Sequence, residues 1–196
     1  MKTIRRSAVV ATVGALAAIV IAGPVRANGG DSAGAAEAAP ANTVLMEGSG
    51  HSIHFTYPKT IVAGEELTIE NRTNSKKVGP HTFSLVTEAD IPKTKKQDKI
   101  CFTPGHICKA VATWHGVKGN NGPPTKNPAK AGNPGWDTEG SLKKKGDSWF
   151  TGQKKNASYT APVTVNTSTG PQKLTFMCVI HPWMHGSIEV LPPTGG

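Results

Sequence analysis

Short runs of strand-forming residues, separated by clusters of Gly, Pro, Asn and Lys, recur through most of this 196-residue chain. Runs of this length between turn residues are typical of all-β domains. A content of 22 Gly and 15 Pro with 37% hydrophobic residues also favours a small, turn-rich globular protein over a helical one. The runs that we predict as strands are 43–47, 53–57, 67–71, 81–86, 163–165, 173–179 and 187–191, and strand texture after the insertion already resumes at Tyr159.

Residues 91–155 interrupt this pattern, because they are rich in Lys, Gly, Pro and Asn and have only scattered apolar residues. The flanking segments 42–90 and 156–196 hold 90 residues together, which is close to the ~100 residues of a compact two-sheet sandwich. We therefore predict a single β-sandwich domain over 42–196, with a long insertion at about 91–155.

The N-terminus begins with basic residues, continues with an apolar run at 8–23, and ends that run with small residues near position 27. This pattern predicts a secretory signal peptide over 1–27, followed by a flexible Gly/Ala-rich leader over 28–41. The alternative is an uncleaved membrane anchor, although the run is shorter than the ~20 residues that a spanning helix needs. We expect an exported protein, periplasmic or extracellular, with membrane association only if the segment stays uncleaved.

Positive charge is concentrated in the insertion. The whole chain carries +9, and removal of residues 1–27 leaves +5. Residues 91–155 hold 13 Lys and four acidic residues, a local charge of +9. Two interpretations stay open, a solvated surface and a docking surface for an acidic partner protein.

Three cysteines are an odd number for an exported protein, so one of them needs another purpose. Cys101 and Cys108 flank a Pro104-Gly105 turn and can pair. A loop of this length gains about 2.5 kcal/mol in the chain-entropy model. Cys178 is then left over as a thiol.

The segment between the last two predicted strands carries a thiol, an imidazole and a thioether within seven residues, at Cys178, His181 and Met184. A loop joining two strands is able to wrap three such side chains around one ion, whereas a strand sends neighbouring side chains to opposite faces. Sulfur together with imidazole selects copper, and two His, one Cys and a weak axial Met define a blue-copper site. His81, at the start of the run 81–86 and after a Gly-Pro turn, supplies the second imidazole.

On these residues the sequence resembles the cupredoxin family, over about 43–90 and 156–192. The resemblance implies an all-β Greek-key sandwich of cupredoxin type that holds one type 1 copper ion. It implies equatorial nitrogens from His81 and His181, a short thiolate bond from Cys178 and a long axial bond from Met184. The Cys-x2-His-x2-Met loop is similar to that of amicyanin. The position of His181 resembles the exposed ligand through which electrons pass, and the insertion is the main departure from the family.

The predicted function is single-electron transfer between protein redox partners, with neither nucleic acid nor a small-molecule substrate as partner. A copper-trafficking or storage protein is the alternative, although Met-rich and His-rich tracts are absent. We do not expect an enzyme, because copper enzymes need further His pairs and the chain has no His-x-His.

The sequence gives less reason to predict the other histidines as metal ligands. We expect His51 and His54, three apart on a predicted strand, to be surface or structural residues, and His185 to lie at the surface. His106 and His115 leave a second metal open, but neither has a paired-ligand spacing.

Overall fold

The computed structural model describes residues 40–117 and 130–194. These residues belong to one compact unit of the chain, and everything below concerns them. The predicted signal peptide and nearly all of the predicted leader lie outside the described residues. Within the described residues, no helix has both the length and the apolar character needed to cross a membrane.

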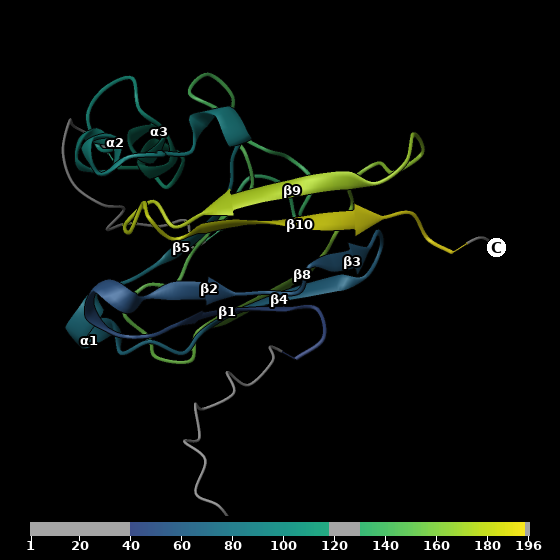
Figure 1. Cartoon of the computed structure of the whole chain (residues 1–196), viewed down its shortest axis with the longest axis horizontal. Helices are drawn as coiled ribbons and strands as arrows, with labels where there is room; N and C mark the ends of the chain where they lie inside the picture. Colours follow the sequence, from purple (N-terminus) through teal and green to yellow (C-terminus); the bar gives the residue numbers. More distant parts are fainter. Residues whose placement is uncertain (1–39, 118–129, 195–196) are drawn as a thin grey trace, which may run out of the picture. The chain divides into compact units, whose positions relative to one another are not determined.

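Two β-sheets face each other and form a sandwich (Figure 1). The first sheet has the order β2-β1-β4-β8, with β1 Thr43–Glu47, β2 His54–Thr56, β4 Glu66–Asn71 and β8 Ser158–Pro162. The second has the order β3-β10-β9-β5-β7-β6, with β3 Thr60–Val62, β5 Thr82–Leu85, β6 Lys130–Ala131, β7 Ser148–Phe150, β9 Gln172–Met177 and β10 His185–Leu191. The predicted all-β sandwich is confirmed.

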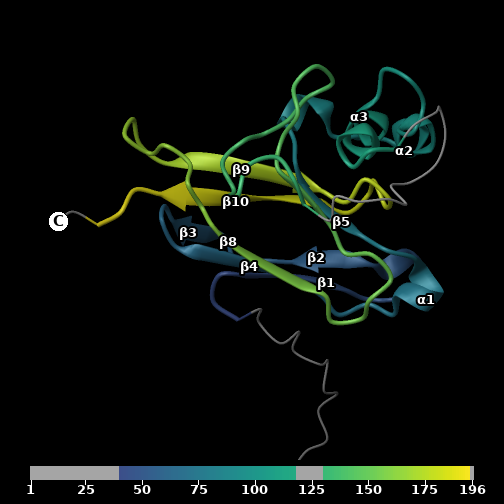
Figure 2. The same ribbon diagram turned by 180° about the vertical axis from the view of Figure 1, so that it is seen from behind.

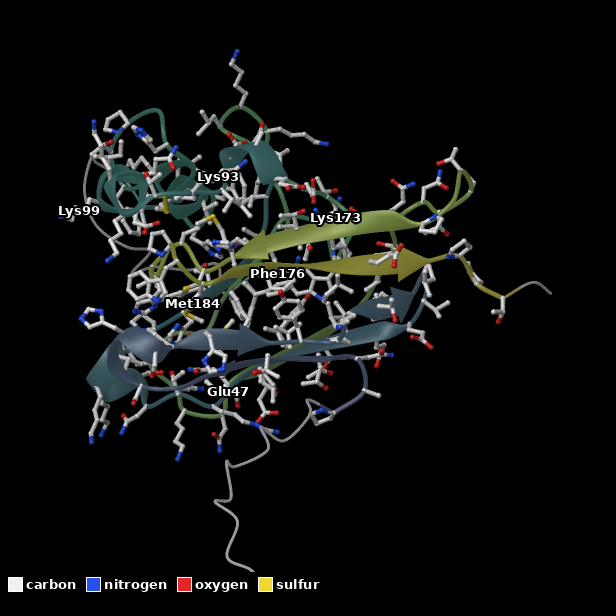
Figure 3. The ribbon with its side chains drawn as sticks, viewed as in Figure 1. Glu47, Lys93, Lys99, Lys173, Phe176 and Met184 are labelled. Atoms are coloured by element: carbon white, nitrogen blue, oxygen red, sulfur yellow. A yellow bond between two sulfur atoms is a disulfide. The ribbon has the colours of Figure 1, made fainter. Side chains whose placement is uncertain are left out.

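Aromatic rings fill the space between the sheets. Phe83 lies at the centre, with its ring centroid 4.7 Å from that of Phe176 and 5.0 Å from that of Trp136. Phe55 packs edge-on against Phe176 at 5.2 Å, an arrangement that aromatic pairs favour. Figure 3 shows Phe176 between the two layers. The alternating burial expected for 67–71 is observed in β4.

The insertion contains helices and strands, which the sequence analysis did not predict. Helix α2 (Lys95–Ile100) and helix α3 (Ile107–Trp114) lie beside the outer face of the second sheet, next to β9 (Figure 2). A disulfide joins Cys101 and Cys108, which confirms the predicted pairing. It belongs to a second core, made of Val86, Ile91, Cys101, Ile107, Cys108, Val111, Met177 and Val179. The insertion therefore covers the outside of the strand that leads to Cys178.

The second half of the insertion joins the sandwich directly, because β7 pairs with β5. A fully buried carboxylate, that of Asp147, holds the loop before it. This carboxylate accepts hydrogen bonds from the backbone N–H groups of Asn133 at 2.6 Å, Asp137 at 3.1 Å and Thr138 at 2.9 Å. Satisfying three backbone donors with one buried carboxylate fixes a loop that has little regular structure.

Several short elements also differ from the sequence prediction. The expected strand at 163–165 is reduced to one bridge between Val163 and Trp136, because the pairing with β4 ends at Pro162. His51 lies in the 3-10 helix η1 (Gly50–Ser52) and not on a strand, because Gly48 and Gly50 have positive φ and turn the chain there. Two further unpredicted elements are helix α1 (Ser75–Val78) and the 3-10 helix η2 (Glu88–Asp90).

Candidate metal centre

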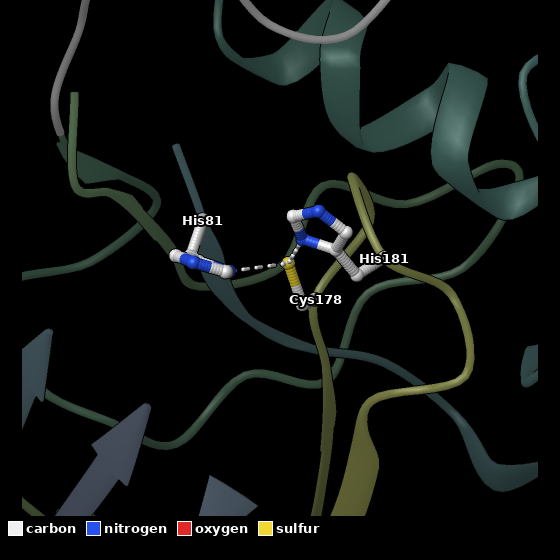
Figure 4. Close-up of side chains that lie close together, drawn as sticks. All are labelled: His81, Cys178 and His181. Carbon is white, nitrogen blue, oxygen red and sulfur yellow. Dashed lines mark hydrogen bonds between the residues drawn. The ribbon is translucent and has the colours of Figure 1, made fainter. Parts of the chain in front are cut away.

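Three of the four predicted ligand residues meet at one end of the sandwich. His81 directly precedes β5, Cys178 directly follows β9, and His181 lies in the loop between β9 and β10. One ligand atom from each lies within 4.8 Å of the other two. The Cys178 Sγ is 3.8 Å from His81 Nδ1 and 3.7 Å from His181 Nδ1 (Figure 4). His81 and Cys178 are fully buried, and His181 is 8% exposed.

The β9–β10 loop closes on itself and carries Met184 back to Cys178. The Met184 N–H donates to the His181 carbonyl at 2.8 Å, and the Cys178 N–H donates to the Met184 carbonyl at 2.9 Å. The Met184 side chain is buried in the main core together with Cys178, and Figure 3 places it at the same end of the sandwich as the loop. Its role as an axial ligand stays a prediction.

The orientation of the His81 ring is fixed by two polar side chains. The Thr73 hydroxyl donates to Asn71 Oδ1 at 2.7 Å, which uses its only hydrogen. The contact of 2.9 Å between Thr73 Oγ1 and His81 Nε2 therefore has the imidazole as donor. With its hydrogen on Nε2, His81 presents the lone pair of Nδ1 to Cys178.

A backbone carbonyl fixes His181 in the same way. His181 Nε2 lies 3.0 Å from the carbonyl oxygen of Val78, at the end of α1, and a carbonyl only accepts. The hydrogen is therefore on Nε2, and the Nδ1 lone pair also faces the sulfur. Partners of this kind set the tautomer and orientation of metal-binding histidines in proteins.

Burial and hydrogen bonding set the protonation of the three groups. Burial, and then the nearby His181, lower the pKa of His81 to about 3. Burial also lowers the pKa of His181. Burial raises the pKa of the Cys178 thiol, while a hydrogen bond from the Thr82 N–H, 3.4 Å from the sulfur, acts in the opposite direction. At neutral pH the site thus offers two neutral imidazoles and a thiol, which a soft metal ion would deprotonate on binding.

This donor set fits copper. Two imidazole nitrogens and one cysteine sulfur converge in a buried space, and each ring nitrogen that faces away already has a protein partner. Such a His2Cys arrangement with a weak Met nearby is the ligand set of blue-copper centres.

The remaining histidines do not join this cluster. His51, His54 and His185 are exposed. His115 is fully buried, and its Nε2 lies 2.8 Å from the Ser148 hydroxyl. In residues 40–117 and 130–194 no second group of three potential metal ligands occurs.

Trp183 covers the outer side of His181, which is less exposed than we expected. The two ring centroids are 5.2 Å apart, and Trp183 itself is 42% exposed. The Trp183 ring therefore lies between His181, the ligand that we expected to be exposed, and the solvent. Trp183 also lines two adjoining grooves, one of about 650 Å³ beside β10 and one of about 480 Å³ beside α2.

Sequence reasoning missed the residues that orient the ligands. Thr82 follows His81 directly and could have been suspected from that position alone. Thr73 and Val78 are separated from their histidines by loops or by most of the chain, and no local pattern marks them. Asn71 lies at the end of a predicted strand, where its buried side chain has no sequence signal.

Comparisons with known proteins add little to this description. No protein-family model matches the chain, and no curated protein matches it. Among solved structures, it is similar to Na-dithionite reduced auracyanin from the photosynthetic bacterium Roseiflexus castenholzii, with 18% sequence identity and a TM-score of 0.41. The match covers 76% of this chain and 95% of that one. The fold class stated above rests on the two sheets of this chain itself.

Proposed function

We propose that this protein is an exported blue-copper protein that carries single electrons between redox partners. One observation carries the proposal: two imidazole lone pairs and one cysteine sulfur converge at a buried point, and the protein fixes both imidazoles in the tautomer that binds metal. Thiolate and imidazole ligands of this number suit copper better than harder ions.

Bound copper supplies a one-electron couple, and the residues of this chain keep its surroundings constant. Thr73 and Val78 hold the two rings from behind, which would keep the rings in place in both oxidation states of a bound ion. The closed loop holds Met184 beside the site, where its thioether would supply a further, weak ligand. A fixed, buried site reorganises little when an electron arrives or leaves, which is the physical requirement for an electron carrier.

Burial of the site favours electron transfer over the two alternatives. A trafficking protein must release its ion to a partner, whereas these ligands are fully buried or only 8% exposed. An enzyme must admit a substrate to the metal, and the same burial opposes that. An electron, in contrast, is able to pass through Trp183, whose ring adjoins His181.

We further propose that an acidic redox partner binds over the lysines of α2. Lys93 lines the larger groove, Lys99 the smaller one and Lys95 both, and Trp183 is common to the two. Asp98 also lines both grooves and Glu88 the larger one, so the charge beside the exposed Trp183 ring is positive only on balance. Opposite charges raise association rates, and salt screens them over about 8 Å at physiological ionic strength.

A visible absorption spectrum tests the copper proposal. Addition of cupric ion to the metal-free protein should produce an intense blue thiolate-to-copper band. Cys178→Ser should remove the band and leave the sandwich folded, because a hydroxyl is a poor ligand for a soft metal. The double variant Cys101→Ser/Cys108→Ser is the control and should keep the band. A blue Cys178→Ser protein would refute the ligand assignment.

Small redox reagents of opposite charge test the partner surface. Hexacyanoferrate, an anion, should exchange electrons faster at low salt, and a cationic cobalt phenanthroline complex should not. Lys95→Glu/Lys99→Glu should slow the anionic reagent. Lys143→Glu/Lys144→Glu makes the same charge change at exposed insertion residues that line neither groove, and should have a smaller effect. Equal effects of the two variants would show that the α2 lysines are solvated surface residues and do not form a docking site.

A further inference from the structure

A line of buried polar side chains runs from the predicted metal site into the insertion. Thr82, Ser84, Ser148 and His115 are all fully buried. Ser84 Oγ lies 3.1 Å from Thr82 Oγ1 and 2.7 Å from Ser148 Oγ, and Ser148 Oγ lies 2.8 Å from His115 Nε2. Strand pairing of β5 with β7 places Ser84 directly opposite Ser148, and His115 follows the last residue of α3.

The hydrogen bonds of this line have a single consistent direction. Ser84 donates to Thr82 Oγ1 and has no second hydrogen to give. Ser148 must therefore donate to Ser84, and it accepts in turn from His115 Nε2–H. His115 thus donates to Ser148, and both serine hydroxyls point away from His115 toward Thr82.

The line of side chains ends at Thr82, whose backbone contacts the sulfur of Cys178. Thr82 Oγ1 accepts from Ser84 and also from the backbone N–H of Val179, at 2.9 Å. With its oxygen occupied by two donors, the hydroxyl has its own hydrogen left to donate. The backbone N–H of Thr82 lies 3.4 Å from Cys178 Sγ. Burial raises the pKa of the Cys178 thiol, and the side chain of Thr82 is among the groups that act in the opposite direction.

We propose that His115 is a positioning residue that tunes the metal site through this relay. By donating to Ser148, His115 aligns the relay so that the Thr82 hydroxyl donates to the Cys178 sulfur. Hydrogen bonds in a buried chain polarise one another, and hydrogen bonds to a ligand sulfur tune the reduction potential of the metal. The insertion thus contributes to the site through Ser148 and His115. The effect on potential rests on the proposed copper function, whereas the relay itself does not.

A purely structural role would not require polar side chains at these positions. Each hydroxyl in the line belongs to a buried residue of the second sheet. An apolar side chain at the same position would fill the space without needing a hydrogen-bond partner. The polar line is continuous, and it leads from the predicted thiolate ligand to a histidine of the insertion. Its loss should therefore change the hydrogen bonding of the sulfur as well as stability.

The test compares His115→Leu, which removes the donor, with His115→Gln, which keeps an N–H donor on a side chain of similar reach. Ser84→Ala cuts the relay with a smaller volume change and covers the case in which His115→Leu fails to fold. His106→Leu, at the other end of α3, is the control. The first readout needs no metal: the infrared S–H stretching frequency of Cys178 in the metal-free protein.

The relay predicts that His115→Leu and Ser84→Ala raise this S–H frequency toward that of a thiol without hydrogen bonds, while His115→Gln and His106→Leu leave it near the wild-type value. In the copper-loaded protein, the equilibrium constant for reduction by a fixed mediator should fall about tenfold in the first two variants, which is 59 mV for a one-electron couple. Unchanged S–H frequencies in His115→Leu and Ser84→Ala would overturn the proposal. Shifted frequencies in a protein that forms no blue band would leave the relay standing and refute the copper function instead.

Discussion

His81 and Cys178 are 97 positions apart in the sequence, yet His81 Nδ1 lies 3.8 Å from Cys178 Sγ. The pairing of β5 with β9, with Ser84 opposite Met177, brings the start of one strand beside the end of the other. The ligands are therefore assembled by the sheet itself. Protein groups also hold both histidine rings from behind, so that both Nδ1 atoms face the sulfur.

Removal of the hydroxyl that holds His81 should weaken copper binding. Thr73→Val keeps the shape of the side chain but leaves the Nε2–H of His81 without an acceptor. Loss of such a partner typically lowers metal affinity by about 10- to 100-fold, and a competition titration against a chelator would measure it. Thr103→Val is the matched control, because Thr103 contacts the ring of His106 at the same 2.9 Å on the exposed surface. Equal affinity in wild type and Thr73→Val would show that the hydroxyl does not orient the ligand.

The metal-free protein should lose stability as the pH falls from about 6.5 toward 3. In the unfolded chain His81 has its ordinary pKa of 6.5, whereas in the folded protein the pKa is about 3. Between these values the unfolded state binds the extra proton, so stability decreases with falling pH, by up to ~1.4 kcal/mol per pH unit for one proton. The lowered pKa of His181 acts in the same direction.

Urea unfolding of the metal-free protein at a series of pH values measures this dependence. His81→Gln should be less sensitive to acid than the wild type, since one of the two buried histidines is gone. His185→Gln changes an exposed histidine and serves as the control. If the free energy of unfolding of His81→Gln depended on pH as steeply as that of the wild type, the acid sensitivity would not come from His81.

The disulfide should stabilise the fold without contributing to the spectrum. The double variant Cys101→Ser/Cys108→Ser opens a loop closed over a sequence separation of seven, which should lower the free energy of unfolding by about 2.5 kcal/mol. The blue band should stay at the same wavelength, because the disulfide lies in the second core, outside the ligand cluster. Thermal unfolding and absorption of the same copper-loaded sample would test both statements, and a shifted band would show that the second core also shapes the site.

Gly186 should tolerate no larger residue, because it makes room for the ring of Tyr57. A Cβ at Gly186 would lie 2.6 Å from Tyr57 Cζ, and Tyr57 packs edge-on against Phe176 at 5.1 Å. Gly186→Ala should cost about 1–3 kcal/mol of stability by overpacking. In a double-mutant cycle with Tyr57→Ala, most of that cost should disappear. Additive costs would place the strain elsewhere.

Local patterns in the sequence were enough to predict most of the sandwich and the residues that converge at its end. The run 43–47 became β1 without change, and the alternation in 67–71 became β4 with every second residue buried. Cys178, His181 and Met184 lie within one loop, so their spacing already limits how far apart they are able to lie. The strands β3, β6 and β7 were missed because they have only three, two and three residues, too few to show a period of two.

The helices of the insertion escaped prediction for a different reason. Helix α2 has six residues and helix α3 has eight, too few for a clear apolar period among so many lysines. Their order comes from the disulfide and from packing on Val86, Met177 and Val179. The disulfide is visible in the local sequence, but the packing on these three residues is not.

The sequence by itself determined the strand-forming runs, the disulfide partners and the thiol, imidazole and thioether of the ligand loop, because periodicity, turn residues and short spacings act between neighbours. Only the tertiary structure decided that Thr73 and Val78 orient the two histidines, that Trp183 covers His181, and that His115 of the insertion joins the line of buried hydroxyls that ends at Thr82. Those contacts join residues as many as 103 positions apart. Their geometry depends on which strands pair, in which register, and on which side chains the packing of the two sheets encloses.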